Sequence, residues 1–331
     1  MSDERVALRA VGEDSLLARL EGPAGLKLLS SAQLDDVAEQ IRTAIIATTA
    51  VTGGHLGPSL GVVELTLALH RVMNSPTDRL VFDTGHQAYP HKLLTGRLAR
   101  FGSLRQLGGI GGFPRRTESP HDVFDGGHAG TGLSIGQGLA LARDVRGTDE
   151  RVAVVVGDAA LMSGLSLEAL NDIGHRGTRL LIVLNDNEMS ISPTVGAIST
   201  YLSRVKLSKS WRRSKGGYDR IIGSVPVIGP TLASLSKSFR RSVISFAQEP
   251  GRLFEDLGIT YIGVLDGHDR PVMEEAFEAA FRMPGPVIVH VRTQKGRGYR
   301  PAEADPITFH GAALPKMEVD RKSTRLNSSH T

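Results

Sequence analysis

The chain contains 331 residues, with 39 Lys and Arg, 35 Asp and Glu, 38 Gly, 16 Pro and no Cys. This length suits one large α/β domain or two ordinary ones. The absence of cysteine excludes disulfides, thiolate nucleophiles, zinc–thiolate sites and iron–sulfur clusters. The sequence has no run of 18 apolar residues and no signal-peptide pattern behind Met1, so we expect no membrane segment and a location in the cytoplasm.

The positive charge of the chain is concentrated in one stretch. Residues 201–250 hold ten basic and two acidic residues, a net charge of +8, whereas the rest of the chain sums to −4. Three interpretations fit such a basic segment. It is a mobile, solvated insertion at about 193–245, a lid that attracts anions, or a surface that binds nucleic acid. Because the charge is confined to one Ser- and Gly-rich stretch, we expect no nucleic-acid partner.

The first predicted elements of the folded part are helices. Ser30 and Gln33 form a capping-box pattern, and apolar residues at helical spacing behind it predict a helix to about residue 49. The glycines and the proline within residues 53–59 interrupt helices and predict a loop. The apolar residues at 62–72 predict a second helix.

Short apolar runs rich in β-branched residues predict the strands. The strongest runs, 152–156 and 179–184, flank a helix predicted at 163–173 that ends at Gly174. Further elements are expected as strands at 79–82, 259–264 and 287–291, a helix at 272–282 and a Gly-rich loop at 107–130. Because strands alternate with helices, the sequence predicts an α/β fold with a doubly wound, mostly parallel sheet and helices on both faces.

Two polar residues follow the two strongest strands. Asp158 and Asn187 should lie at the same edge of the sheet, where parallel sheets bind ligands. One carboxylate and one carboxamide are few ligands for Ca²⁺ but suit Mg²⁺ that is also bound to phosphate oxygens, so the implied ligand is a diphosphate. The Gly-rich stretch 126–130 would let backbone N–H groups approach the phosphates. The alternative is that both residues only cap or turn the chain after a strand.

Five histidines fall in segments rich in glycine and proline, at His55, His86, His91, His128 and His310. Each one alone is readily explained as a hydrogen-bonded loop residue. Several of them beside a diphosphate site would form a cluster that donates to carbonyl or phosphate oxygens and transfers protons near neutral pH.

Several strings of this sequence match a known pattern. Gly157-Asp158 followed by Asn187 resembles the thiamine diphosphate motif of the transketolase superfamily. Longer matching strings run in order through the chain from about residue 14 to 315, at Gly53–Gly61, Gly85–Lys92, Leu184–Ser192, Asp266–Asp269 and Lys295–His310. With these strings the sequence resembles the 1-deoxy-D-xylulose-5-phosphate synthase family of transketolase-like enzymes.

The resemblance implies a thiamine diphosphate-dependent transferase. The family joins pyruvate, with loss of CO₂, to glyceraldehyde 3-phosphate, in the first step of non-mevalonate isoprenoid synthesis, and its product also feeds thiamine synthesis. It further implies Mg²⁺ as second cofactor and a homodimer. Two alternatives are another transketolase-type enzyme and a non-catalytic binding module. The string at residues 299–306 favours the synthase over another transketolase-type enzyme.

The resemblance also assigns roles to single residues. The metal ligands would be Asp158, Asn187 and the backbone carbonyl of Met189, while His55 and His310 would lie near the reacting carbonyl and assist proton transfer. The implied cofactor contacts are His86, Gly127, His128, Ala129, Ala159, Ala160, Asn187 and Tyr299.

This chain departs from the family pattern in two ways. Ala159 stands where the motif usually has Gly, and its methyl group is tolerated at negative φ but would crowd the cofactor at positive φ. The family's enzymes are also about twice as long, and the glutamate that activates the cofactor lies in a domain beyond this one. The resemblance therefore covers the N-terminal domain only, and we expect this fragment to be inactive alone.

The sequence predicts three regions. Residues 1–29 are an N-terminal extension with a short helix, residues 30–315 are the diphosphate-binding domain, and residues 316–331 are a tail. Within the tail, residues 320–331 resemble a translated sequencing adapter and are excluded from the reasoning about the fold.

Overall fold

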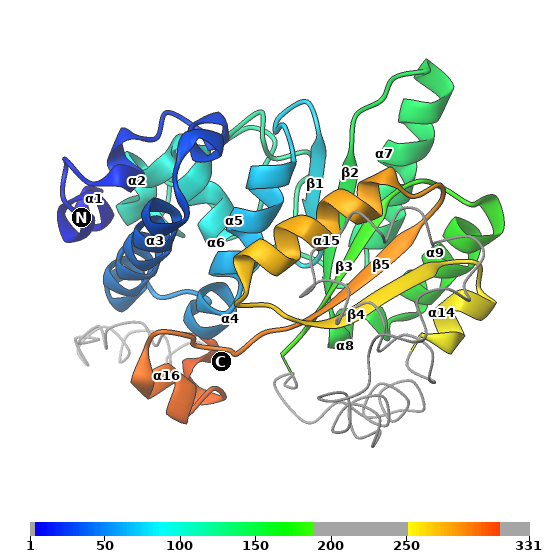
Figure 1. Ribbon diagram of the computed structural model, residues 1–331. Coiled ribbons are helices and arrows are strands. Elements are labelled where there is room, and N and C mark those ends of the chain that lie inside the picture. Colours follow the sequence, from blue (N-terminus) through cyan, green and yellow to red (C-terminus); the bar gives the residue numbers. More distant parts are fainter. Residues whose placement is uncertain (1–3, 188–250, 312–331) are drawn as a thin grey trace, which may run out of the picture.

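The computed structural model describes residues 4–187 and 251–311, which surround one parallel β-sheet. The strand order is β1-β2-β3-β5-β4, and every neighbouring pair is parallel (Figure 1). The strands are β1 Arg79–Phe82, β2 Val152–Gly157, β3 Leu181–Asp186, β4 Thr260–Asp266 and β5 Val287–Arg292. Valine, isoleucine and leucine fill the central strands because the sheet is covered on both faces.

Helices cover both faces of the sheet, as predicted. Helices α5 and α15 pack on one face, and α7 and α9 pack on the other. The longer helices are α3 Ser31–Thr52, α5 Val63–Val72, α7 Gly132–Arg146, α9 Gly164–Arg176 and α15 Arg270–Arg282. The short helices are α1 Val6–Val11, α2 Leu16–Arg19, η1 Pro23–Leu28, α4 Leu56–Leu60, α6 Tyr89–Lys92, η2 Leu93–Arg97, η3 Leu98–Ser103, α8 Asp158–Leu161, α14 Arg252–Asp256, α16 Arg300–Ala304 and η7 Thr308–His310.

The segment before residue 30 packs into the structure through three short helices, where the sequence predicts one. Leu17 and Leu26 are buried in a cluster with α3 and α6. The capping box is confirmed, because the Ser30 side chain accepts from the Gln33 amide and the Gln33 side chain accepts from the Ser30 amide. The boundary at residue 30 and the tail at 316–331 stay predictions, and residues 312–331 lie outside the described part of the chain.

Three predicted boundaries are wrong for tertiary reasons. The segment expected to be a loop at 53–59 contains the short helix α4, which packs against η7 and α16. Strand β3 continues to Asp186 because its last residues pair with β5. Helix α9 passes through Gly174 and ends at Arg176, with Gly177 as its left-handed C-cap. The missing side chain of Gly174 lets the carbonyl of Leu257 approach the helix closely.

The basic stretch at about 193–245 lies outside the described residues.

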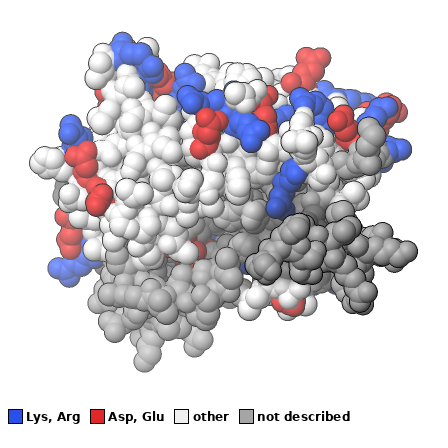
Figure 2. Space-filling model, turned by 180° about the vertical axis from the view of Figure 1, so that it is seen from behind, with Lys and Arg blue, Asp and Glu red and all other residues white. Residues whose placement is uncertain are grey.

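On the face shown in Figure 2, the drawn Lys and Arg side chains lie among Asp and Glu side chains along the upper and side edges of the molecule. Among the residues that the structure describes, no helix is long and apolar enough to span a membrane.

The contrast between two helical glycines tests the packing at α9. A Cβ atom at Gly174 would lie 1.9 Å from the Leu257 carbonyl oxygen, whereas a Cβ at Gly138 in α7 would have no described atom within 4 Å. Alanine is favoured over glycine inside helices by about 1 kcal/mol, so Gly138→Ala should raise the free energy of unfolding by up to that amount. We expect Gly174→Ala to lower it by about 1–3 kcal/mol, because the helix must move away from α14. Chemical denaturation measures the free energy of unfolding of both variants. A higher free energy of unfolding in Gly174→Ala than in wild type would contradict the close packing of Leu257 on α9.

Candidate functional site

A cavity of about 430 Å³ lies at the carboxyl ends of the strands. Helices α4 and α8 lie at this edge of the sheet (Figure 1). The segments that follow β1, β2, β3 and β5 contribute Asp83, Asp158, Asn187 and Lys295 to its lining. The parallel register brings them together, because Phe82 pairs with Val155 and Gly157 pairs with Asn185. The predicted site residues that line the cavity are His55, His86, Ala129, Asp158, Ala159, Ala160, Asn187 and His310.

Asp83 fixes the Gly-rich turn at the rim of this cavity. Its carboxylate accepts the amide of Gly130 at 2.9 Å and the amide of Gly132 at 2.7 Å. Gly130 has φ +85°, and a Cβ there would lie 2.1 Å from the Ser163 hydroxyl oxygen, so only glycine fits. Ala129 faces the cavity as a result, whereas Gly127 and His128 are exposed beside it and are not part of its lining.

Ala159 occupies a position that an alanine accepts without strain. It lies in α8, where φ is negative, and its neighbours Asp158 and Ala160 also line the cavity. The positive φ that would have made the Gly-to-Ala difference costly does not occur here.

Three histidines from distant parts of the sequence meet at one wall. The ring centroids of His55 and His86 are 5.2 Å apart, and that of His310 lies 5.7 and 5.8 Å from them. Burial, and then the nearby His310 and Arg105, lowers the pKa of His55 to about 4. Burial, and then the neighbouring His55 and His310, lowers the pKa of His86 to about 3. Burial and Lys295 also lower the pKa of His310, so all three rings are neutral at pH 7.

Several buried polar atoms of this cavity have no hydrogen-bond partner among the described residues. They are the Nδ1 atoms of His55, His86 and His310 and the ammonium nitrogen of Lys295. Lys295 is 4 % exposed, and burial lowers its pKa. A buried cation without a partner is costly, so this arrangement suits an anionic ligand with oxygen acceptors. The residues present therefore fit a diphosphate, and Asp158 and Asn187 bring to the cavity the oxygen atoms that a hard metal ion prefers.

Other predicted residues lie elsewhere. The ring of Tyr299 packs edge-on against Phe309, with centroids 6.0 Å apart, and does not line the cavity. His91 is buried outside the cavity and contacts His70 and Asp122. Met189 lies outside the described residues. Within the described ranges, no group of three or more His, Asp or Glu side chains could hold a metal ion by itself.

Seven lining residues were not among the predicted site residues: Pro58, Asp83, Thr84, Gln87, Phe113, Gly157 and Lys295. Asp83 and Thr84 follow a predicted strand, so the rule that singles out Asp158 could have found them. Lys295 follows the last strand by three residues, but a single lysine in a Gly-rich segment carries no signal of burial. Phe113 reaches the cavity from the long loop 107–130, which no local pattern could reveal.

Comparison with solved structures defines the class of fold. A transketolase from Campylobacter jejuni superposes with a TM-score of 0.62 over 87 % of this chain and 41 % of its own length, at 21 % identity. A transketolase from Pichia stipitis gives a TM-score of 0.60 over 86 % of this chain and 39 % of its own, at 23 % identity. The chain therefore has the fold of the transketolase domain that these structures share.

Sequence comparison then identifies the family. The model of the N-terminal part of 1-deoxy-D-xylulose-5-phosphate synthase matches residues 17–293, so the chain belongs to this family. The synthase of Heliobacterium modesticaldum is 48 % identical over 315 residues, which are 94 % of this chain and 48 % of the relative. That of Desulforudis audaxviator is 49 % identical over 286 residues, 86 % of this chain and 45 % of the relative. The chain thus spans about half the length of the curated relatives it matches.

The buried histidines predict how stability depends on pH. Below pH 6.5 the unfolded chain takes up a proton at residue 86 that the folded chain, with a pKa of about 3, does not bind. The free energy of unfolding should therefore fall as the pH drops from 6.5 toward 3. His86→Gln removes this contribution, so we expect its stability to decline less steeply over this range, measured by denaturation at several pH values. His175→Gln, at an exposed histidine of α9, is the control. If the free energy of unfolding declines equally steeply with falling pH in His86→Gln and in wild type, His86 is not buried as described.

Proposed function

We propose that this chain is the N-terminal, diphosphate-binding part of a 1-deoxy-D-xylulose-5-phosphate synthase that uses thiamine diphosphate and Mg²⁺. The main support is one observation: Asp158, Asn187 and Lys295, whose ammonium group has no hydrogen-bond partner among the described residues, line one cavity at the strand ends of a chain from this family. The reaction is the joining of pyruvate, with loss of CO₂, to glyceraldehyde 3-phosphate.

The chain's own residues would hold the cofactor by its charged end. Thiamine diphosphate, when bound, supplies a carbanion-stabilising centre for the reaction. Asp158 and Asn187, with the backbone carbonyl of Met189, would hold Mg²⁺, and Lys295 would donate to the diphosphate. Ala129, Ala159, Ala160 and His86 border the same cavity, and Gly127 and His128 lie on the turn at its rim. Tyr299 lies outside the lining, as Gly127 and His128 do, and remains part of the proposal as a cofactor contact implied by the resemblance.

The histidines would act on the substrate as neutral groups. Their Nδ1 atoms have no partner among the described residues, so a proton can be exchanged there with a bound molecule. His55 and His310 would take this role near the reacting carbonyl. Burial keeps their pKa values low, so each ring accepts a proton only when a negative charge develops beside it.

Activity would need more than these 331 residues. The relatives are about twice as long, and we infer that the rest of such a protein supplies the group that activates the cofactor. Pyruvate and glyceraldehyde 3-phosphate as substrates, a homodimeric assembly and a location in the cytoplasm are part of this proposal. The chain alone would bind the cofactor weakly and would not turn over.

Substitution of Asp158 tests the metal assignment. Thiamine diphosphate should bind to the chain only with a divalent ion, and Asp158→Asn should weaken that binding at least tenfold, since it removes the only carboxylate proposed as a ligand. Isothermal titration calorimetry with and without Mg²⁺ measures both effects. Asp256→Asn, at an exposed aspartate of α14, is the matched control. Equal affinity in Asp158→Asn and wild type would contradict the assignment.

A further inference from the structure

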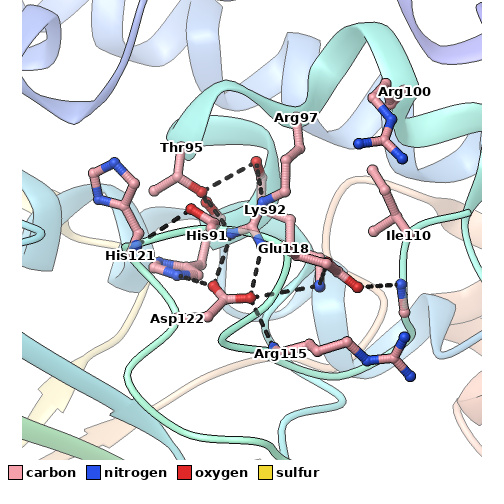
Figure 3. A network of polar contacts seen from close by, with 12 residues as sticks. His91, Lys92, Thr95, Arg97, Arg100, Ile110, Arg115, Glu118, His121 and Asp122 are labelled. Carbon is pink, nitrogen blue, oxygen red and sulfur yellow. Dashed lines mark hydrogen bonds and ion pairs between the residues drawn. The ribbon is translucent and has the colours of Figure 1, made fainter.

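A second cluster of charged side chains lies next to the cavity and outside its lining (Figure 3). Lys92 at the end of α6 donates to Glu118 at 2.6 Å and lies 3.8 Å from Asp122. Arg97 donates to both carboxylate oxygens of Asp122, at 2.7 and 2.9 Å, and His91 contacts the same carboxylate at 3.1 Å. The side chains of Lys92 and Asp122 are fully buried. The two cations balance the two carboxylates.

Both carboxylates also bind the backbone of the loop that follows η3. Glu118 accepts the amide of Gly111 at 2.6 Å through one oxygen and Lys92 through the other. Asp122 accepts the amide of Arg115 at 2.8 Å. Each carboxylate therefore ties a point on the loop to the segment 92–97, and residues 112–114 lie between the two points.

The residues between these two points form a wall of the cavity. The Phe113 ring lies 5.9 Å from the ring of His55, centroid to centroid, and lines the cavity. Pro114 packs against two glycines of the rim, since a Cβ at Gly85 or Gly126 would lie 2.5 or 2.9 Å from its Cδ. A shift of this loop would thus change the surroundings of His55 and the shape of the rim.

Helix α6 holds the same histidine from the other side. The hydroxyl oxygen of Tyr89, at the start of α6, accepts the backbone amide of His55 at 3.2 Å. The four residues of α6 therefore link the backbone of His55 to the ion cluster that anchors Phe113.

We propose that the buried cluster of Lys92, Arg97, Glu118 and Asp122 positions the Phe113–Pro114 wall and thereby sets the affinity of the cavity for its ligand. The identity of that ligand, thiamine diphosphate with Mg²⁺, rests on the proposed function. Buried ion pairs add little net stability over apolar packing, but loss of one partner leaves a costly unpaired charge, so the cluster favours a single loop geometry. Glu118 and Asp122 are positioning residues, because they do not line the cavity.

A pair of double variants separates loop anchoring from folding. Lys92→Met/Glu118→Gln and Lys92→Met/Glu118→Leu both remove one positive and one negative charge and leave the Arg97–Asp122 pair in place. Glutamine can still accept the Gly111 amide, whereas leucine cannot. Each variant of the 331-residue chain is compared with wild type by melting temperature, amide hydrogen exchange at Gly111, and titration of thiamine diphosphate with Mg²⁺.

We expect the glutamine variant to keep wild-type exchange rates and a Kd within about threefold of wild type. The leucine variant should melt within a few degrees of it, exchange at least tenfold faster at Gly111, whose amide has lost its acceptor, and bind the cofactor at least tenfold more weakly. If leucine is not accommodated, Lys92→Met/Glu118→Ala removes the same acceptor with a smaller side chain.

Two results would overturn the proposal: unchanged exchange in the variant that lacks the acceptor, or faster exchange with an unchanged Kd. Failure of the proposed function is a separate result. In that case the wild-type chain itself does not bind thiamine diphosphate, and hydrogen exchange, which needs no ligand, still decides whether the cluster anchors the loop.

Discussion

The parallel alignment of four strands is the constraint on which the site depends. Because β1, β2, β3 and β5 run in the same direction and in register, the residues that follow each of them reach one edge of the sheet. Asp83, Asp158, Asn187 and Lys295 come from segments up to about 200 residues apart in the chain, yet line one cavity. Burial of the sheet on both faces keeps this edge rigid, so the polar groups are held in place before a ligand arrives.

Desolvation then gives the cavity its chemical character. It keeps three clustered histidines neutral and lowers the pKa of Lys295, whose side-chain nitrogen has no hydrogen-bond partner among the described residues. An anion with several oxygens would relieve this cost, and a metal ion at Asp158 would complete the charge balance. The same principle operates in the neighbouring ion cluster, where each buried charge has an opposite charge beside it and the result is a fixed loop.

The sequence predicted the parts of this arrangement that depend on local patterns. The strand at 152–156 and the capping box at Ser30 follow from residue type and spacing, and the pairing of β2 with β3 brings Asp158 and Asn187 to one edge as expected. Features that depend on tertiary contacts were beyond such reasoning. Phe113 reaches His55 from the long loop 107–130, and the Leu257 carbonyl closely approaches Gly174 from a segment about 80 residues further along the chain. Tyr299, assigned by resemblance alone, packs against Phe309, and its contact with a cofactor stays a prediction.

The central claim is that the strand-end cavity binds a metal-bound diphosphate, and crystallography with an anomalous scatterer tests it most directly. A crystal of this chain grown with thiamine diphosphate and Mn²⁺ in place of Mg²⁺ locates the ion by its anomalous signal. The account predicts a peak in coordination contact with the Asp158 carboxylate and the Asn187 side chain, with diphosphate oxygens beside the Lys295 ammonium group. Binding of the metal and diphosphate elsewhere, with this cavity filled only by water, would contradict it.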